Sequence, residues 1–269
     1  MNGYRKNDGQ LELFIKEKVA QDHREDLVIN NLIKIENYTK QDGQFDPSLF
    51  IIVSGGEKRE RDYFNFYAKY SKHFPRIVIE FICENSEGRT GLDVLALVER
   101  AKEIKKHKQE SKSEDILDSI NIVTDVDDFY AQLVEKMHEC SVADLNLIIS
   151  NPCFEIWLYY AYFGEKPSIT IPEDRKKISK TLKKYLNDES NGGIDPRKAP
   201  WYIQNANLNS KTNYLEDDNK IPTLFSTQMH ILGERLYELS KDDLSALIEK
   251  EEETRQEKIL EQKKIKSKR

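Results

Sequence analysis

The chain has 269 residues, of which 38% are apolar and 33% charged, so it can bury a core beneath a heavily charged surface. Its net charge of −6, from 42 basic and 48 acidic residues, excludes a general polycation, so contact with nucleic acid would need a local basic patch or a metal ion. Three widely spaced cysteines and the lack of a long apolar run predict a soluble, cytoplasmic protein without a disulfide framework or a membrane span.

Changes in sequence pattern predict four regions. Residues 1–45 carry apolar residues at helical spacing and are expected to form a helical N-terminal extension. Residues 46–163 are expected to form an α/β core, and residues 164–240 a mostly helical C-terminal region. Within the latter, the basic segment 176–185 is the best local patch for phosphate contacts, or else a solvated helix face. Residues 241–269 are nearly all charged and predict a solvated helix, a partner-binding tail or disorder.

The core is predicted from four alternations of a short apolar run with a helical stripe. The runs are rich in Ile, Val and Leu and indicate buried strands of a parallel sheet. They cover residues 49–53, 76–82, 120–124 and 145–149. The fold class is therefore α/β, with a four-stranded, mainly parallel sheet flanked by helices.

A glycine-rich turn follows the first predicted strand. Ser54–Gly56 leads directly into a helix start, where glycines admit close contact with the backbone and the helix dipole attracts anions. Glu57 and Glu60 are candidate metal ligands and catalytic acids, with simple stabilisation of the helix dipole as the alternative. Lys58 and Arg59 are candidate contacts to a substrate phosphate, with a surface role as the alternative.

Three acids follow the third predicted strand within four residues. Asp125 and Asp127 come at its carboxyl end, and ligands of parallel α/β sheets bind just beyond such ends. If the backbone is still extended there, the spacing of two places both carboxylates on one face, where Mg²⁺ or Mn²⁺ would relieve their repulsion. Asp128 is a further candidate ligand, or it is the N-cap of the next helix.

The end of the fourth predicted strand adds a further candidate. Ser150 is placed to contact a phosphate, although Ser150 or Asn151 could instead cap a helix with Pro152 in its first turn. Trp157 and its apolar neighbours are interpreted as core rather than as a base-stacking platform. Glu155 either suits the helix dipole or faces the acidic residues.

Three blocks of the sequence resemble the RloB family, also called AbiLii-like. They are Ile52–Phe64, Asp125–Phe129 and Ser150–Leu158, and the last is the most specific. The resemblance covers about residues 49 to 215. It implies that residues 46–163 adopt a Toprim-like catalytic fold with Mg²⁺-dependent phosphodiester cleavage. It also implies a role in bacterial defence against phage, commonly beside an ATPase partner.

The resemblance also assigns individual residues. Asp125 and Asp127 match the family's acidic pair, and Glu60 matches an acid of the first block. After the first strand the family typically has Glu-Gly. This chain has Gly55 and Gly56 there, so Gly55 takes the place of the glutamate. In Toprim enzymes that glutamate is a metal ligand or a general acid/base. Either Glu57 substitutes for it, or the chain is a catalytically silent variant, or the residue at this position was altered.

Together these features predict a component of a bacterial antiphage system, a Toprim-like nuclease that uses Mg²⁺ or Mn²⁺ and works with a partner ATPase. DNA and RNA, including tRNA, remain open as targets, as do homo-oligomerisation and the number of metal ions. The alternative is a catalytically silent regulatory or assembly module that binds the ATPase through the charged tail and the N-terminal extension. Nucleotidyl transfer, as in primases, would use the same acids.

Overall fold

The computed structural model describes residues 48–56, 58–83, 93–110, 119–127, 129–174, 177–189 and 194–267. The chain divides into two compact units, Met1–Gln41 and Asp42–Arg269, and all described residues belong to the second. The expected N-terminal extension, 1–45, therefore lies outside the described residues.

The second unit is built on a mainly parallel sheet, as predicted. Its strands are β1 Ser48–Ser54, β2 Ile77–Ile82, β3 Ser119–Asp125, β4 Asn146–Asn151 and β5 Ser226–Thr227. Their order is β2-β1-β3-β4-β5, with parallel pairing throughout except for the short fifth strand, which pairs antiparallel with β4. The chain passes from β1 to one side and then returns to the other side for β3. A topological switch point therefore lies between the carboxyl ends of β1 and β3.

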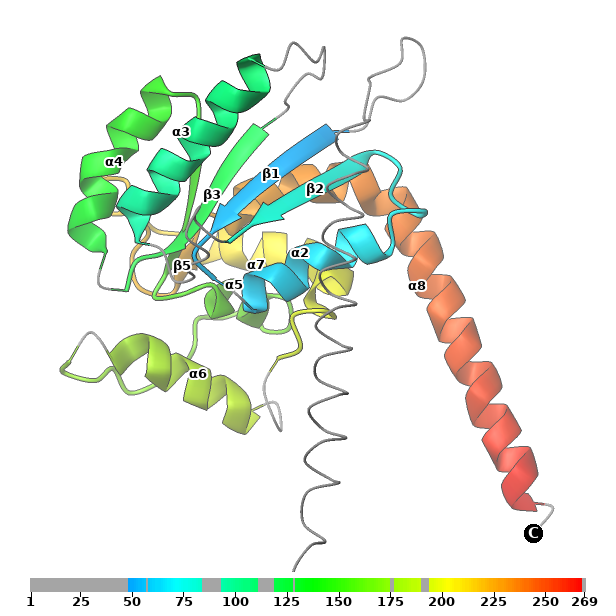
Figure 1. Cartoon of the computed structure of the whole chain (residues 1–269). Helices are drawn as coiled ribbons and strands as arrows, with labels where there is room; N and C mark the ends of the chain where they lie inside the picture. Colours follow the sequence, from blue (N-terminus) through cyan, green and yellow to red (C-terminus); the bar gives the residue numbers. More distant parts are fainter. Residues whose placement is uncertain are drawn as a thin grey trace, which may run out of the picture. The chain divides into compact units, whose positions relative to one another are not determined.

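Helices cover both faces of the sheet (Figure 1). They are α2 Arg59–Lys69, α3 Val94–Glu110, α4 Tyr130–Val142, α5 Glu155–Tyr160, α6 Ile178–Glu189, α7 Ile203–Thr212 and α8 Met229–Ser267, with a 3₁₀ turn, η2, at Ala199–Tyr202. Alternate residues of a strand point to opposite faces. Leu49, Ile51 and Val53 of β1 accordingly pack with α3 and α4, whereas Phe50 and Ile52 pack with the helices of the other face.

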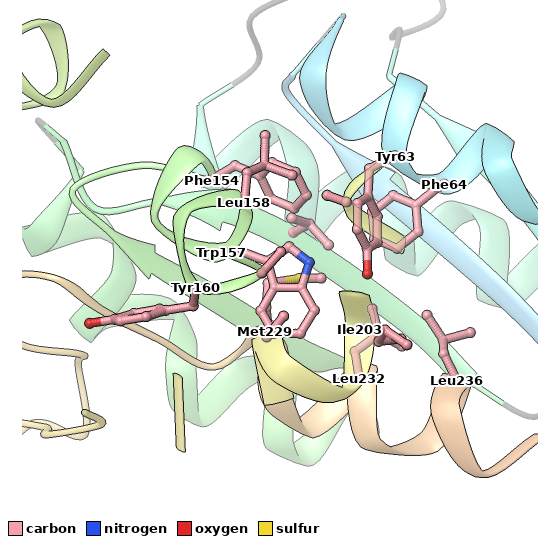
Figure 2. Close-up of a cluster of buried hydrophobic side chains, with 14 of the residues drawn as sticks. Tyr63, Phe64, Phe154, Trp157, Leu158, Tyr160, Ile203, Met229, Leu232 and Leu236 are labelled. Atoms are coloured by element: carbon pink, nitrogen blue, oxygen red, sulfur yellow. The ribbon is translucent and has the colours of Figure 1, made fainter. Parts of the chain in front are cut away.

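The larger of the two cores centres on aromatic side chains (Figure 2). Trp157 is fully buried, and its ring makes an edge contact with Tyr63, with centroids 6.1 Å apart. Tyr63 makes a similar contact with Phe154 at 5.7 Å. Ile203 and Leu232 bring α7 and α8 into the same cluster. The interpretation of the Trp157 segment as core rather than as a stacking platform is therefore confirmed.

Cys83, Cys140 and Cys153 are buried and form no disulfide with one another. No helix in the described part of the chain combines the length and apolar character needed to cross a membrane. Helix α8 is continuous to Ser267, so the described part of the charged tail is helical.

Gly233 of α8 allows close packing of this helix against Trp157 and α7. A Cβ atom on it would lie 2.3 Å from Asn207 Oδ1 and 2.7 Å from Trp157 Cη2. Gly→Ala in a helix ordinarily stabilises it, so a loss of stability would be diagnostic of this contact. We expect Gly233→Ala to lower the free energy of unfolding in urea by about 1–3 kcal/mol. Gly164→Ala is the control, since its Cβ would lie an ordinary 3.7 Å from Asn209 Oδ1.

Candidate active site

The turn after β1 brings Glu60 into the interior. Gly56 N–H donates to Ser54 Oγ at 3.0 Å, and α2 begins three residues after this glycine. Glu60, in the first helical turn, is buried. A Cβ atom on Gly56 would lie 2.0 Å from the carboxyl carbon of Glu60. The glycine therefore leaves the space that the Glu60 carboxyl group fills.

Asp125 is the last residue of β3 and the centre of the site. Part of the residue is exposed to solvent, but its Oδ1 atom is inaccessible to solvent and has no hydrogen-bond partner. Burial raises the pKa of Asp125 well above its usual range, and the negative charges of Glu60, Glu155 and Asp127 raise it further. A buried carboxylate oxygen without a partner is costly, so this group favours either a proton or a cation.

Asp127 reaches the same group by a different geometry from the one expected. The strand ends at Asp125, and Asp127 has a left-handed φ of 23°, which Asp adopts more readily than most residues. Its N–H donates to the Pro152 carbonyl at 3.3 Å, and its carboxylate accepts a hydrogen bond from Ser179 Oγ. The condition of an extended backbone is thus not met at Asp127, although the two aspartates do interact.

Glu155, the first residue of α5, faces the acidic residues rather than only the helix dipole. Its side chain is 8% exposed, with Lys183 Nζ 3.5 Å and Arg59 Nε 3.9 Å from Oε1. Arg59 Nη1 also donates to the Ile194 carbonyl at 2.7 Å. We name the four carboxylates and their two cations the acidic cluster. Its members are Glu60, Asp125, Asp127, Glu155, Arg59 and Lys183.

Lys183 and Ser179 were not connected to this site from the sequence. They lie one helical turn apart on α6, so they share a face. Burial alone would lower the pKa of Lys183, but the carboxylates of Glu155, Asp125 and Asp127 and the Cys153 thiol together raise it. The sequence did contain a signal for this face of the helix. Ser179 and Lys183 are four residues apart, and each directly follows an apolar residue, Ile178 or Leu182, that is buried.

Other predicted site residues do not join the acidic cluster. Ser150 is fully buried, and its hydroxyl is 2.8 Å from Thr227 Oγ1, so it is not placed for the phosphate contact expected of it. Nor does it cap a helix, because α5 begins at Glu155 with Phe154 at the N-cap position. Lys58 is exposed.

Two further candidates cannot be placed. Glu57 and Asp128 lie outside the described residues. Helix α4 has Phe129 at its N-cap position.

Glu60 gives the site a protonation step near neutral pH. Burial, reinforced by the charge of Glu155, raises the pKa of Glu60 to about 7 from 4.5. Because the folded-state pKa is the higher one, the stabilisation from this group is complete below pH 4.5 and is lost as the pH rises through 7.

We therefore expect Glu60→Gln to flatten the pH dependence of stability. Relative to Glu60→Gln, the wild-type protein should lose up to about 3 kcal/mol of unfolding free energy between pH 4.5 and pH 8. Urea denaturation of both proteins at several pH values measures this difference. A constant difference across the range would contradict the raised pKa of Glu60.

The fold and site together define a class: an α/β protein with carboxylates gathered at the switch point of a parallel sheet, where such proteins bind ligands. The family model described as RloB-like protein matches residues 50–236. The chain therefore belongs to the RloB-like family, as its sequence blocks predicted. No curated protein and no solved structure matched it.

Proposed function

We propose that the protein is a metal-dependent phosphodiesterase that cuts nucleic acid as part of a bacterial antiphage system, with a Toprim-like core. Its membership of the RloB-like family supports the biological setting. One observation carries the chemistry: the sealed, unpartnered Oδ1 of Asp125 lies among three other carboxylates. Carboxylates held together at the carboxyl end of a parallel sheet are suited to a divalent cation and a phosphate.

The donor chemistry of the acidic cluster fits Mg²⁺ or Mn²⁺. Asp125 and Asp127 would hold the ion, with Glu60 beside them. Within the described ranges, no group of three or more His, Cys, Asp or Glu side chains is arranged as a metal site. Mg²⁺ usually binds through one or two carboxylates and keeps several waters, so a pair of aspartates suffices. When bound, the ion would supply Lewis-acid stabilisation of charge on the phosphoryl oxygens.

The chain's own residues would carry out the remaining steps. With a pKa of about 7, the Glu60 carboxyl group can hold or release a proton near neutral pH, as a general acid/base requires. Arg59 and Lys183 place positive charge at the rim of the acidic cluster. There they would balance the non-bridging oxygens of a phosphate.

A polyanionic substrate also needs attraction beyond the acidic cluster, because the chain is acidic overall. Helix α6 offers this locally. Lys180 and Lys184 are exposed on it, and Lys177 precedes it with its side chain 68% exposed. A basic helix beside the carboxylates would guide a phosphate backbone across them. This supports nucleic acid, DNA or RNA, as the substrate class.

The test is to combine Mn²⁺ binding with cleavage. Calorimetric titration of the purified chain with Mn²⁺ should give saturable binding that Asp125→Ala/Asp127→Ala removes. Incubation with duplex DNA, single-stranded DNA and tRNA should give cutting that depends on Mg²⁺ or Mn²⁺ and is lost in the same variant. Adding the partner ATPase to a second set of reactions includes the case in which it is required.

The second candidate is the catalytically silent regulatory or assembly module. It is favoured by Gly55, which stands where the family typically has glutamate, and by the long run of exposed side chains on α8. This reading predicts no Mn²⁺ binding and no cutting, with or without the ATPase. Gain of cutting in Gly55→Glu would show that the scaffold is competent and that this one position silences it.

A further inference from the structure

We propose that Lys183 is a built-in counter-cation, which competes with the divalent ion for the acidic cluster and thereby sets the affinity of the ion. The inference rests on the proposed function, because it takes the acidic cluster as the metal site. It concerns a residue outside the aspartate pair, on an element that follows the α/β core in sequence.

Helix α6 is anchored to the larger core by one apolar face. Ile178, Leu182 and Leu186 are buried in the larger core, one turn apart along the helix. This apolar stripe fixes the rotation of the helix and directs Ser179 and Lys183 towards the acidic cluster. Ser179 contacts Asp127 and Lys183 contacts Glu155, so a single helix face holds carboxylates from two separate segments.

The acidic cluster contains more carboxylates than cations. Among the described residues, the acidic cluster sets four carboxylates against two cations, Arg59 and Lys183. The unpartnered Oδ1 of Asp125 is an independent sign that positive charge is lacking there. A divalent ion would meet this deficit but would also repel the Lys183 ammonium. Binding of the ion and retention of Lys183 among the carboxylates are therefore opposed.

The Lys183 side chain can move, whereas that of Arg59 is held in place. The Arg59 guanidinium has a second anchor in the Ile194 carbonyl. Lys183 lies 3.5 Å from Glu155, longer than a good hydrogen bond, and its side chain is 47% exposed. A four-carbon stem lets the ammonium swing into solvent while α6 stays in place. There the displaced ammonium would meet the phosphate of the substrate.

The experiment compares Mn²⁺ binding by wild-type protein and Lys183→Met, with melting temperatures measured with and without Mn²⁺. We expect Lys183→Met to bind Mn²⁺ about 5- to 10-fold more tightly, because the competing charge is gone. Its melting temperature should fall without Mn²⁺ and recover when Mn²⁺ is added. Lys183→Gln serves the same purpose if the Met variant does not fold.

Two control variants distinguish competition between Lys183 and Mn²⁺ from a non-specific effect of removing one positive charge. Lys180→Met removes the same charge from an exposed position on the same helix, and it should leave the Mn²⁺ affinity within about 2-fold of wild type. Lys183→Arg keeps the charge and should bind Mn²⁺ as wild type does. If Lys183 formed only a structural ion pair, Lys183→Met would instead lower the melting temperature equally with and without Mn²⁺.

The outcomes distinguish this inference from the proposed function. If Lys183→Met binds Mn²⁺ no more tightly than wild type while Asp125→Ala/Asp127→Ala abolishes binding, the counter-cation role is overturned and the metal site stands. If the double aspartate variant binds Mn²⁺ as well as wild type, both fall together.

Discussion

Substitution of Asp125 by asparagine is expected to abolish the proposed metal-dependent phosphodiester cleavage while raising the stability of the protein at neutral pH. Asparagine keeps the size of the side chain but removes the negative charge, which burial and three neighbouring carboxylates disfavour. We expect cleavage to fall by about 10³-fold. The free energy of unfolding should rise by about 1–2 kcal/mol, the trade-off expected where a site is strained for function.

The pH dependence of this gain in stability follows from the direction in which the pKa of Asp125 is shifted. A carboxyl group with a raised pKa stabilises the folded state at low pH and loses that stabilisation as the pH rises. The advantage of Asp125→Asn should therefore vanish in acid and grow towards neutral pH. Urea denaturation at pH 4 and pH 7.5 measures it. A variant that is less stable than wild type at pH 7.5 would contradict repulsion within the acidic cluster.

Asp188→Asn is the matched control for Asp125→Asn. Asp188 is exposed on α6, and its substitution removes the same charge away from the acidic cluster. We expect its cleavage rate and stability to match those of wild type. Retention of cleavage by Asp125→Asn alongside this control would remove Asp125 from the mechanism.

Gly56→Ala is expected to act by expelling the Glu60 carboxyl group. The added Cβ would lie 2.0–2.2 Å from the three carboxyl atoms of Glu60, and these are the mobile end of a side chain rather than backbone. The backbone at Gly56 has no left-handed φ, so alanine fits it. We expect cleavage and Mn²⁺ affinity to fall about 10- to 100-fold, with little loss of stability.

A double-mutant cycle tests this explanation. Glu60→Ala should cause a similar loss on its own, and Gly56→Ala should add nothing in that background, because the clash no longer exists. Cleavage rates and Mn²⁺ titrations of the four proteins measure the coupling. Additive losses would mean that Gly56 acts on something other than Glu60. Gly164→Ala, whose Cβ would make only an ordinary contact of 3.7 Å with Asn209 Oδ1, should match wild type.

Local sequence patterns predicted the sheet and the segments that supply the acidic residues of the candidate site. The third apolar run was placed within one residue of β3, because a buried parallel strand is nearly all apolar and its end is marked by the first acid. Parallel order then implied that Asp125 and the turn before Glu60 meet at one edge of the sheet. The pairing of Ser54 with Val123, at the carboxyl ends of β1 and β3, shows that these two strand ends are neighbours.

The parts that sequence patterns missed depend on contacts between distant segments. Ser150 is paired with Thr227, 77 residues later, through a strand of two residues that has no periodicity to detect. Lys183 reaches Glu155 because α6 packs on the core, which a basic segment does not reveal by itself. Helix α7 is rich in Asn and lacks a strong apolar stripe. Each of these features is decided by tertiary packing.

The length of α8 has a mechanical consequence. Its first turns are wedged beside Trp157, with Met229 fully buried, and its last core contacts are at Leu247 and Ile248. The remaining turns to Ser267 extend about 30 Å along the helix at 1.5 Å per residue. A protein that bound this outer stretch would be connected to the core by a rigid helix rather than by a flexible linker. Its spacing from the hydrophobic interior would then be set by backbone geometry instead of by chain entropy.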